Sequence, residues 1–185
     1  MRRREFITHI VTGTIALTAT RGQAVAQERR YLTEEQALRQ AFPGSEHIVR
    51  DEKQLSDDQL QTVEKALGIR LRSRTQAVYR AETRGATDGY AMIANEVGKE
   101  QFITFLVAMN RQFKVLRVTL LVFRESRGWE VEDRRFSDQF RGKTSSDRLL
   151  VGSDIIGVTG ATLSSRAFCR GIKKALVICE ALYKN

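Results

Sequence analysis

The sequence predicts an α+β domain in which an antiparallel sheet meander packs with helices. Three strand-like runs occupy the middle of the 185-residue chain, only short polar turns separate them, and a long amphipathic helical pattern ends the chain. Strands joined by so few residues must be antiparallel. An antiparallel sheet with helices before and after it defines the α+β class.

The predicted strands cover residues 89–94, 101–108 and 114–123, which are rich in β-branched and aromatic side chains. Polar turns at 98–100 and 110–112 separate them. These runs give the sheet of the predicted domain core.

Two short helices precede the strands, and each has a start and a stop signal. Thr33 followed by Gln36 forms a capping box for the first, and Ser56 can cap the second. The Pro-Gly pair at 43–44 ends the first helix and Gly68 ends the second.

The last helix is predicted over residues 162–183, where apolar residues recur at three- and four-residue spacing. A short helix at 136–140 and one more strand at 149–151 are predicted before it. The chain therefore divides into an N-terminal helical segment, 27–88, and a domain core, 89–185.

Residues 1–26 resemble a secretory signal peptide. Three arginines lead into an apolar run at 10–19, and a small-x-small cleavage site ends at Ala26. The Arg3-Arg4 pair with its following Phe-Ile resembles the twin-arginine export signal. The apolar run is far shorter than the ~20 residues of a membrane-spanning helix. We expect cleavage near Ala26 and a periplasmic or otherwise extracytoplasmic mature chain; the alternative is an uncleaved amphipathic anchor that keeps the protein at the membrane.

The charge balance argues against a nucleic-acid partner. The formal net charge is +9, but the basic residues are scattered among acidic ones and form no single block. We expect a solvated basic surface with an affinity for acidic partners.

The cysteine and histidine content indicates neither a disulfide, nor a metal site, nor a nucleophile pair. Cys169 and Cys179 lie ten residues apart on the last helix, a rise of about 15 Å, whereas bridged Cα atoms lie within ~7 Å. His9 falls in the signal peptide, and His47 has no partner at ligand spacing. We expect both thiols to be buried apolar groups and predict no catalytic residue.

Residues 158–165, at the start of the last helix, are the best candidate for a site. Gly160 permits close backbone approach, the first-turn N–H groups are unpaired, and the helix dipole is positive there. An anion such as a phosphate suits this position, although serine and threonine at a helix start also serve as plain caps.

The segment Thr159-Gly160-Ala161-Thr162-Leu163-Ser164-Ser165 resembles the Ser/Thr-Gly-Ala-Thr-x-Ser/Thr motif of FMN-binding domains. These domains occur in subunits of the sodium-pumping NADH:quinone reductase, in Rnf complexes and in stand-alone exported proteins. The resemblance implies that Thr162 carries flavin mononucleotide (FMN) through a phosphoester, which a flavin transferase installs from FAD. It implies that the other motif residues bind phosphate or shape the turn.

A second segment supports the resemblance. Glu125-Ser126-Arg127-Gly128-Trp129 stands where family members carry Glu-Thr-Pro-Gly-Leu, a loop that lies against the flavin. The resemblance implies ring contacts from Glu125, Ser126, Gly128 and Trp129. A cation near the ring would favour the reduced, anionic flavin. The candidates are Lys143, Arg127 and Arg166, and the alternative for each is a solvated surface position. Ile156 departs from the pattern, since members often carry an aspartate there and the nearest acid is Asp154. This departure concerns the covalent bond more than flavin binding.

The resulting expectation is an exported FMN-binding electron carrier that works with a membrane-bound redox protein. One alternative is an exported binding or scaffold module of the same fold without flavin. Another is a flavin-dependent reductase with its own small substrate, for which the sequence indicates no additional acid or base.

Overall fold

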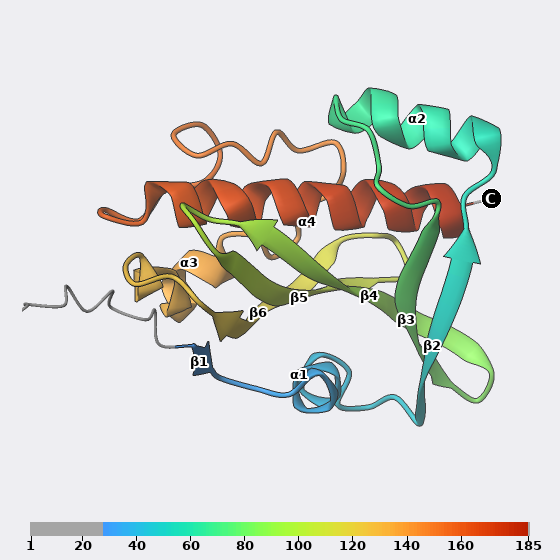
Figure 1. Cartoon of the computed structure of the whole chain (residues 1–185). Helices are drawn as coiled ribbons and strands as arrows, with labels where there is room; N and C mark the ends of the chain where they lie inside the picture. Colours follow the sequence, from blue (N-terminus) through green and yellow to red (C-terminus); the bar gives the residue numbers. More distant parts are fainter. Residues whose placement is uncertain (1–27, 185) are drawn as a thin grey trace, which may run out of the picture.

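The protein forms one six-stranded antiparallel sheet with helices on both faces (Figure 1). The computed structural model describes residues 28–184. The strands, in the order β1-β6-β5-β4-β3-β2 across the sheet, are β1 (Arg29–Arg30), β2 (His47–Gln54), β3 (Thr75–Thr83), β4 (Ala86–Val97), β5 (Phe102–Asn110) and β6 (Val115–Phe123). The helices are α1 (Glu34–Ala41), α2 (Asp57–Leu67), the 3-10 helix η1 (Trp129–Glu132), α3 (Arg134–Asp138) and α4 (Thr162–Tyr183). The predicted α+β class and antiparallel meander are confirmed.

The three predicted strands are confirmed as β4, β5 and β6, in the centre and on one side of the sheet. Seven consecutive residues of β5, 103–109, are buried, because helices cover both faces of this strand. Figure 1 shows α4 along one face and α1 on the other. Burial on both faces explains why β5 reads as a continuous apolar run in the sequence.

The prediction of a purely helical segment at 27–88 is wrong in part, because this segment also supplies β1, β2 and β3. β2 is an edge strand whose polar side chains are mostly exposed, so it shows no apolar alternation in the sequence. The strand predicted at 149–151 is also wrong. Only an isolated bridge between Val151 and Ile155 forms there, inside an irregular loop.

The predicted capping box at Thr33 and the predicted cap at Ser56 are both confirmed, and Ser56 also forms a full capping box. The Thr33 hydroxyl accepts from the Gln36 N–H at 3.2 Å, and the Gln36 side chain accepts from the Thr33 N–H at 3.0 Å. The same reciprocal pair joins Ser56 and Gln59, and α2 ends at Gly68 in the left-handed conformation, φ 67°. Local sequence therefore sets where these two helices begin.

The core has two layers, one on each face of the sheet. The larger lies between the sheet and α4 and contains the stacked pair Phe105 and Phe168. The smaller lies under α1 and includes Leu38, Phe42 and Leu106. α4 thus packs along the sheet for most of its 22 residues, and this packing fixes where its first turn lies.

Gly171 lies where α4 approaches the sheet closely. A Cβ added there would lie 2.6 Å from the Phe105 ring and 3.1 Å from the Ala94 Cβ. We expect Gly171→Val to lower the free energy of unfolding by about 1–3 kcal/mol, because the helix must move away from the sheet. Urea unfolding measures this. Gly44→Val is the control, since an added Cβ meets nothing within 4 Å there; equal losses in both variants would contradict the expectation.

Cys169 and Cys179 are both buried free thiols, which confirms that they do not pair. Within residues 28–184, no helix combines the length and the apolar character of a membrane span. The same residues contain no cluster of three or more histidine, cysteine and acidic side chains that could hold a metal ion. The predicted signal peptide, 1–26, lies outside the described residues.

Candidate functional site

The candidate anion site is the start of α4. Thr162 is the first helical residue and is exposed, and Ala161 before it makes no side-chain capping hydrogen bond. Gly160 has φ +81°, and nothing lies within 4 Å of a Cβ added to it. Helix geometry leaves the N–H groups of the first turn without partners in the helix. The turn therefore presents backbone donors and the hydroxyls of Thr159 and Thr162 to an open surface.

Ser165 shapes this turn from inside. Its side chain is fully buried, and its hydroxyl donates to the Ala161 carbonyl at 2.9 Å and accepts from the Val158 N–H at 3.2 Å. The Ala161 N–H also bonds to the Val158 carbonyl at 3.0 Å. The Ser165 hydroxyl is thus committed to the turn and stabilises its shape, which leaves phosphate contact to the exposed side, where Thr159 and Thr162 lie.

The loop at 125–129 lies against the start of α4 through Gly128. A Cβ added to Gly128 would lie 2.8 Å from the Ser164 hydroxyl and 3.5 Å from the Ala161 Cβ. Gly128 also has φ +85°, a conformation that favours glycine. Two segments more than thirty residues apart in the chain therefore meet at the candidate site, as the family resemblance implies.

Glu125 has a different role from the expected ring contact. Its buried carboxylate accepts hydrogen bonds from the N–H groups of Lys99, Glu100 at 2.8 Å and Gln101 at 3.0 Å. A Cβ added to Gly98 would lie only 2.7 Å from the same carboxylate oxygen. Glu125 therefore fixes the turn between β4 and β5, and sequence reasoning missed this role because the partners are backbone groups distant in the chain.

Trp129 and Ser126 are the exposed members of the loop. The Trp129 side chain is 41% exposed, and the Arg29 guanidinium lies 5.3 Å from its ring centre. Ser126 and Arg127 are exposed beside it. Of the residues expected to contact the ring, Trp129 and Ser126 are therefore exposed near the motif, whereas Gly128 is buried against the start of α4.

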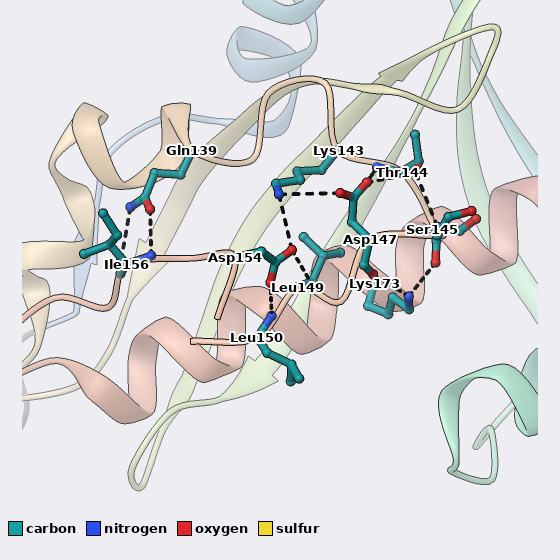
Figure 2. A network of polar contacts seen from close by, with 11 residues as sticks. Gln139, Lys143, Thr144, Ser145, Asp147, Leu149, Leu150, Asp154, Ile156 and Lys173 are labelled. Carbon is teal, nitrogen blue, oxygen red and sulfur yellow. Dashed lines mark hydrogen bonds and ion pairs between the residues drawn. The ribbon is translucent and has the colours of Figure 1, made fainter. Parts of the chain in front are cut away.

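Lys143 is partly buried and belongs to the polar network drawn in Figure 2. Its ammonium lies 3.2 Å from the Asp154 carboxylate and 3.5 Å from that of Asp147. The Asp154 carboxylate also accepts from the N–H groups of Leu149 at 3.0 Å and Leu150 at 2.8 Å. Lys143 is therefore neutralised by two acids. This pairing argues against Lys143 as the cation near the flavin ring.

The network changes the pKa values of Asp154 and Lys143. Burial works to raise the pKa of Asp154, but the two backbone hydrogen bonds and Lys143 together lower it to about 2. Burial works to lower the pKa of Lys143, and its contact with Asp154 outweighs this and raises the pKa. Both groups are charged at neutral pH, and Asp154 organises the loop that leads to the motif.

Acid should weaken this loop. The pKa of Asp154 is about 2 in the folded protein, against an ordinary value of 3.8. Ionised Asp154 therefore contributes fully to the free energy of unfolding above about pH 4, and this contribution is lost as the pH falls towards 2. We expect Asp154→Asn to lower the free energy of unfolding by about 1–3 kcal/mol at neutral pH, with a smaller difference from wild type at pH 2. Urea unfolding at several pH values measures this. Asp138→Asn, at an exposed position of α3, controls for the lost charge; a difference independent of pH would contradict the assignment.

Gln139 fixes the segment immediately before the motif. Its side-chain amide donates to the Ile156 carbonyl at 3.1 Å and accepts from the Ile156 N–H at 2.8 Å. Ile156 itself is 78% exposed, so its side chain projects from this held backbone into solvent (Figure 2). Sequence spacing could not indicate this role of Gln139, because its partner is a backbone group.

Comparison with known proteins identifies the class of this site. Residues 98–177 match the sequence model of the FMN-binding domain family. The matched residues contain both the loop at 125–129 and the start of α4. Residues 98–177 are therefore similar to an FMN-binding domain, and this family indicates FMN as the cofactor.

A solved structure supports the fold. NqrC of Shewanella oneidensis is similar with a TM-score of 0.53 and 16% sequence identity, over 77% of this chain and 87% of that chain. At this identity the likeness concerns the fold. No curated protein sequence matches the chain.

Proposed function

We propose that this protein is an exported electron carrier that holds FMN covalently, through a phosphoester on Thr162. The observation that carries the proposal is the exposed Thr162 hydroxyl at the uncapped start of α4, directly after the open turn at Gly160. An unpaired helix N-terminus is a favourable place for a phosphate, and a hydroxyl at the same place can be esterified.

The residues around Thr162 fit a flavin phosphate. The first-turn N–H groups can donate to the phosphate oxygens, and the helix dipole favours their negative charge. Ser165 holds the turn in shape from beneath, and the glycine at 160 leaves the approach open. Gly128 and Trp129 would border the flavin from the adjacent loop. FMN supplies one- and two-electron redox chemistry, while the protein sets its position and exposure.

The attachment step is a transfer from FAD. The Thr162 oxygen forms a new bond to the FMN phosphorus of FAD, the bond that joins the two FAD phosphates breaks, and AMP leaves while the hydroxyl proton is lost. A flavin transferase would catalyse this step outside the cytoplasm. An ester makes retention independent of affinity, which matters for an exported protein because lost FMN could not be replaced from a cytoplasmic pool.

The partner in this proposal is a membrane-bound redox protein, from which or to which the carrier passes electrons. Support comes from the fold shared with NqrC and from the signal-like residues at 1–26. Fractionation of cells that produce the full chain, with and without its arginine pair at 3–4, tests export: we expect the wild type outside the cytoplasmic membrane and the variant inside.

One experiment tests the covalent bond. The full chain is produced together with a flavin transferase, denatured and separated by gel electrophoresis, and the gel is examined for flavin fluorescence. We expect a fluorescent band and a mass increase equal to FMN less water. A yellow native protein that loses all its flavin on denaturation would overturn the covalent bond and leave a non-covalent flavoprotein. A colourless protein would favour the scaffold alternative.

A further inference from the structure

A cationic cleft lies beside residues 166–174 of α4, and Arg166 is its one member that the sequence analysis named as a candidate cation near the flavin. It has a volume of about 690 Å³ and lies between the end of α2, the loop at 148–153 and the exposed side of α4. Figure 1 shows α2 beside α4 on this face of the sheet. We define the basic cleft by its cations, Arg148, Arg166, Arg170, Lys173 and Lys174, and its one acid, Glu96.

The positive charge of the basic cleft is only partly compensated. The Glu96 carboxylate lies 3.6 Å from Arg170 and 3.7 Å from Lys174, so one acid faces two cations. Lys173 donates to backbone carbonyls and not to a carboxylate. Arg148 and Arg166 are exposed, and neither forms an ion pair within residues 28–184. The two aspartates behind the loop share one cation, Lys143, so this group carries one net negative charge and offsets only part of the positive charge of the basic cleft.

The basic cleft also has apolar walls. Leu150 is 55% exposed and Ile69 is 50% exposed, one on each side of the cleft. Exposed arginines around apolar side chains are typical of protein interfaces, where charge steers the partner and apolar contacts hold it. A small free anion would use the cations but would leave the apolar walls bare.

We propose that the basic cleft docks an acidic segment of a partner protein, with carboxylates on Arg148 and Arg166 and apolar side chains on Leu150 and Ile69. Thr162 and Arg166 are one turn apart on the same face of α4, about 6 Å along the helix axis. A partner in the basic cleft would therefore lie next to a flavin on Thr162. This last consequence rests on the proposed function, whereas docking itself does not require the flavin.

Binding of an acidic peptide to flavin-free protein tests the proposal. The probe is a fluorescein-labelled peptide that combines glutamate and leucine, and fluorescence anisotropy at low salt gives its affinity. Production without a flavin transferase keeps the protein free of covalent flavin, so failure of the flavin hypothesis cannot affect the result. The test variant is Arg148→Glu/Arg166→Glu. The control, Arg111→Glu/Arg135→Glu, changes the net charge equally at exposed positions outside the cleft.

We expect the cleft variant to weaken peptide binding at least about tenfold, and the control less than about twofold. Added salt should weaken binding to the wild type much more than to the cleft variant. Leu150→Ser should also weaken binding, although it leaves the charge unchanged. Equal losses in the cleft and control variants would overturn the proposal, because attraction would then follow net charge alone. A last test adds inorganic phosphate, with chloride at the same ionic strength as the control. If phosphate displaces the peptide and chloride does not, the docking proposal is overturned in favour of a small-anion site.

Discussion

Replacing Thr162 by alanine is expected to abolish the covalent flavin completely while leaving the fold intact. Thr162 is exposed and is the first residue of α4, and its side chain makes no capping hydrogen bond. Alanine is a better helix former than threonine, so the substitution should not destabilise the helix. The measurement is in-gel flavin fluorescence and intact mass after production with a flavin transferase.

Two matched variants make this result specific. Thr162→Ser retains a hydroxyl at the same position and should retain the adduct, at least in part. Thr159→Ala removes the other exposed threonine of the motif and should leave the adduct on Thr162. An adduct that survives Thr162→Ala, or that disappears in Thr159→Ala, would place the bond on another residue.

Phe168→Ala is expected to produce the largest loss of stability, about 3–5 kcal/mol in the free energy of unfolding. Phe168 is 1% exposed, and its ring stacks on that of Phe105 with 4.2 Å between centres. The Phe136 ring meets it edge-on at 5.5 Å. Truncation would leave a cavity where α4, β5 and α3 meet, within two helical turns of Thr162.

Urea unfolding of flavin-free protein measures this loss. Leu163→Ala is the control, because Leu163 lies on the same helix but is 45% exposed, and we expect a change of less than about 0.5 kcal/mol. If the two variants lose similar stability, the aromatic cluster is not the centre of the core. Reduced flavin loading in Phe168→Ala alone would show that the packing of α4 also positions its first turn.

The local parts of the structure could be read from the sequence because their signals are local. Thr33 and Ser56 cap helices through residues three positions away, and β5 is a continuous apolar run. The turn at Gly160 and the start of α4 at Thr162 likewise follow from adjacent residues. The turn and helix start that form the candidate site were therefore predictable from the sequence.

The remaining strands could not be read in this way. β2 is polar and exposed at the sheet edge, so only its pairing with β3 makes it a strand. The opposite error occurred at 149–151, where an apolar triplet resembles a strand but has no neighbour with which to form a ladder. In both cases backbone partners far away in the chain decided the outcome.

The sequence by itself determined the α+β class, the caps, the long final helix and the motif that carries Thr162. Only the tertiary structure decided what the polar side chains around that motif do. Glu125 binds the turn at 99–101, Ser165 holds the turn before α4, and Lys143 is neutralised by Asp147 and Asp154. The physical reason is that a buried polar group must find a hydrogen-bond partner, and the partner is whichever group folding brings close to it. Sequence spacing cannot show that proximity.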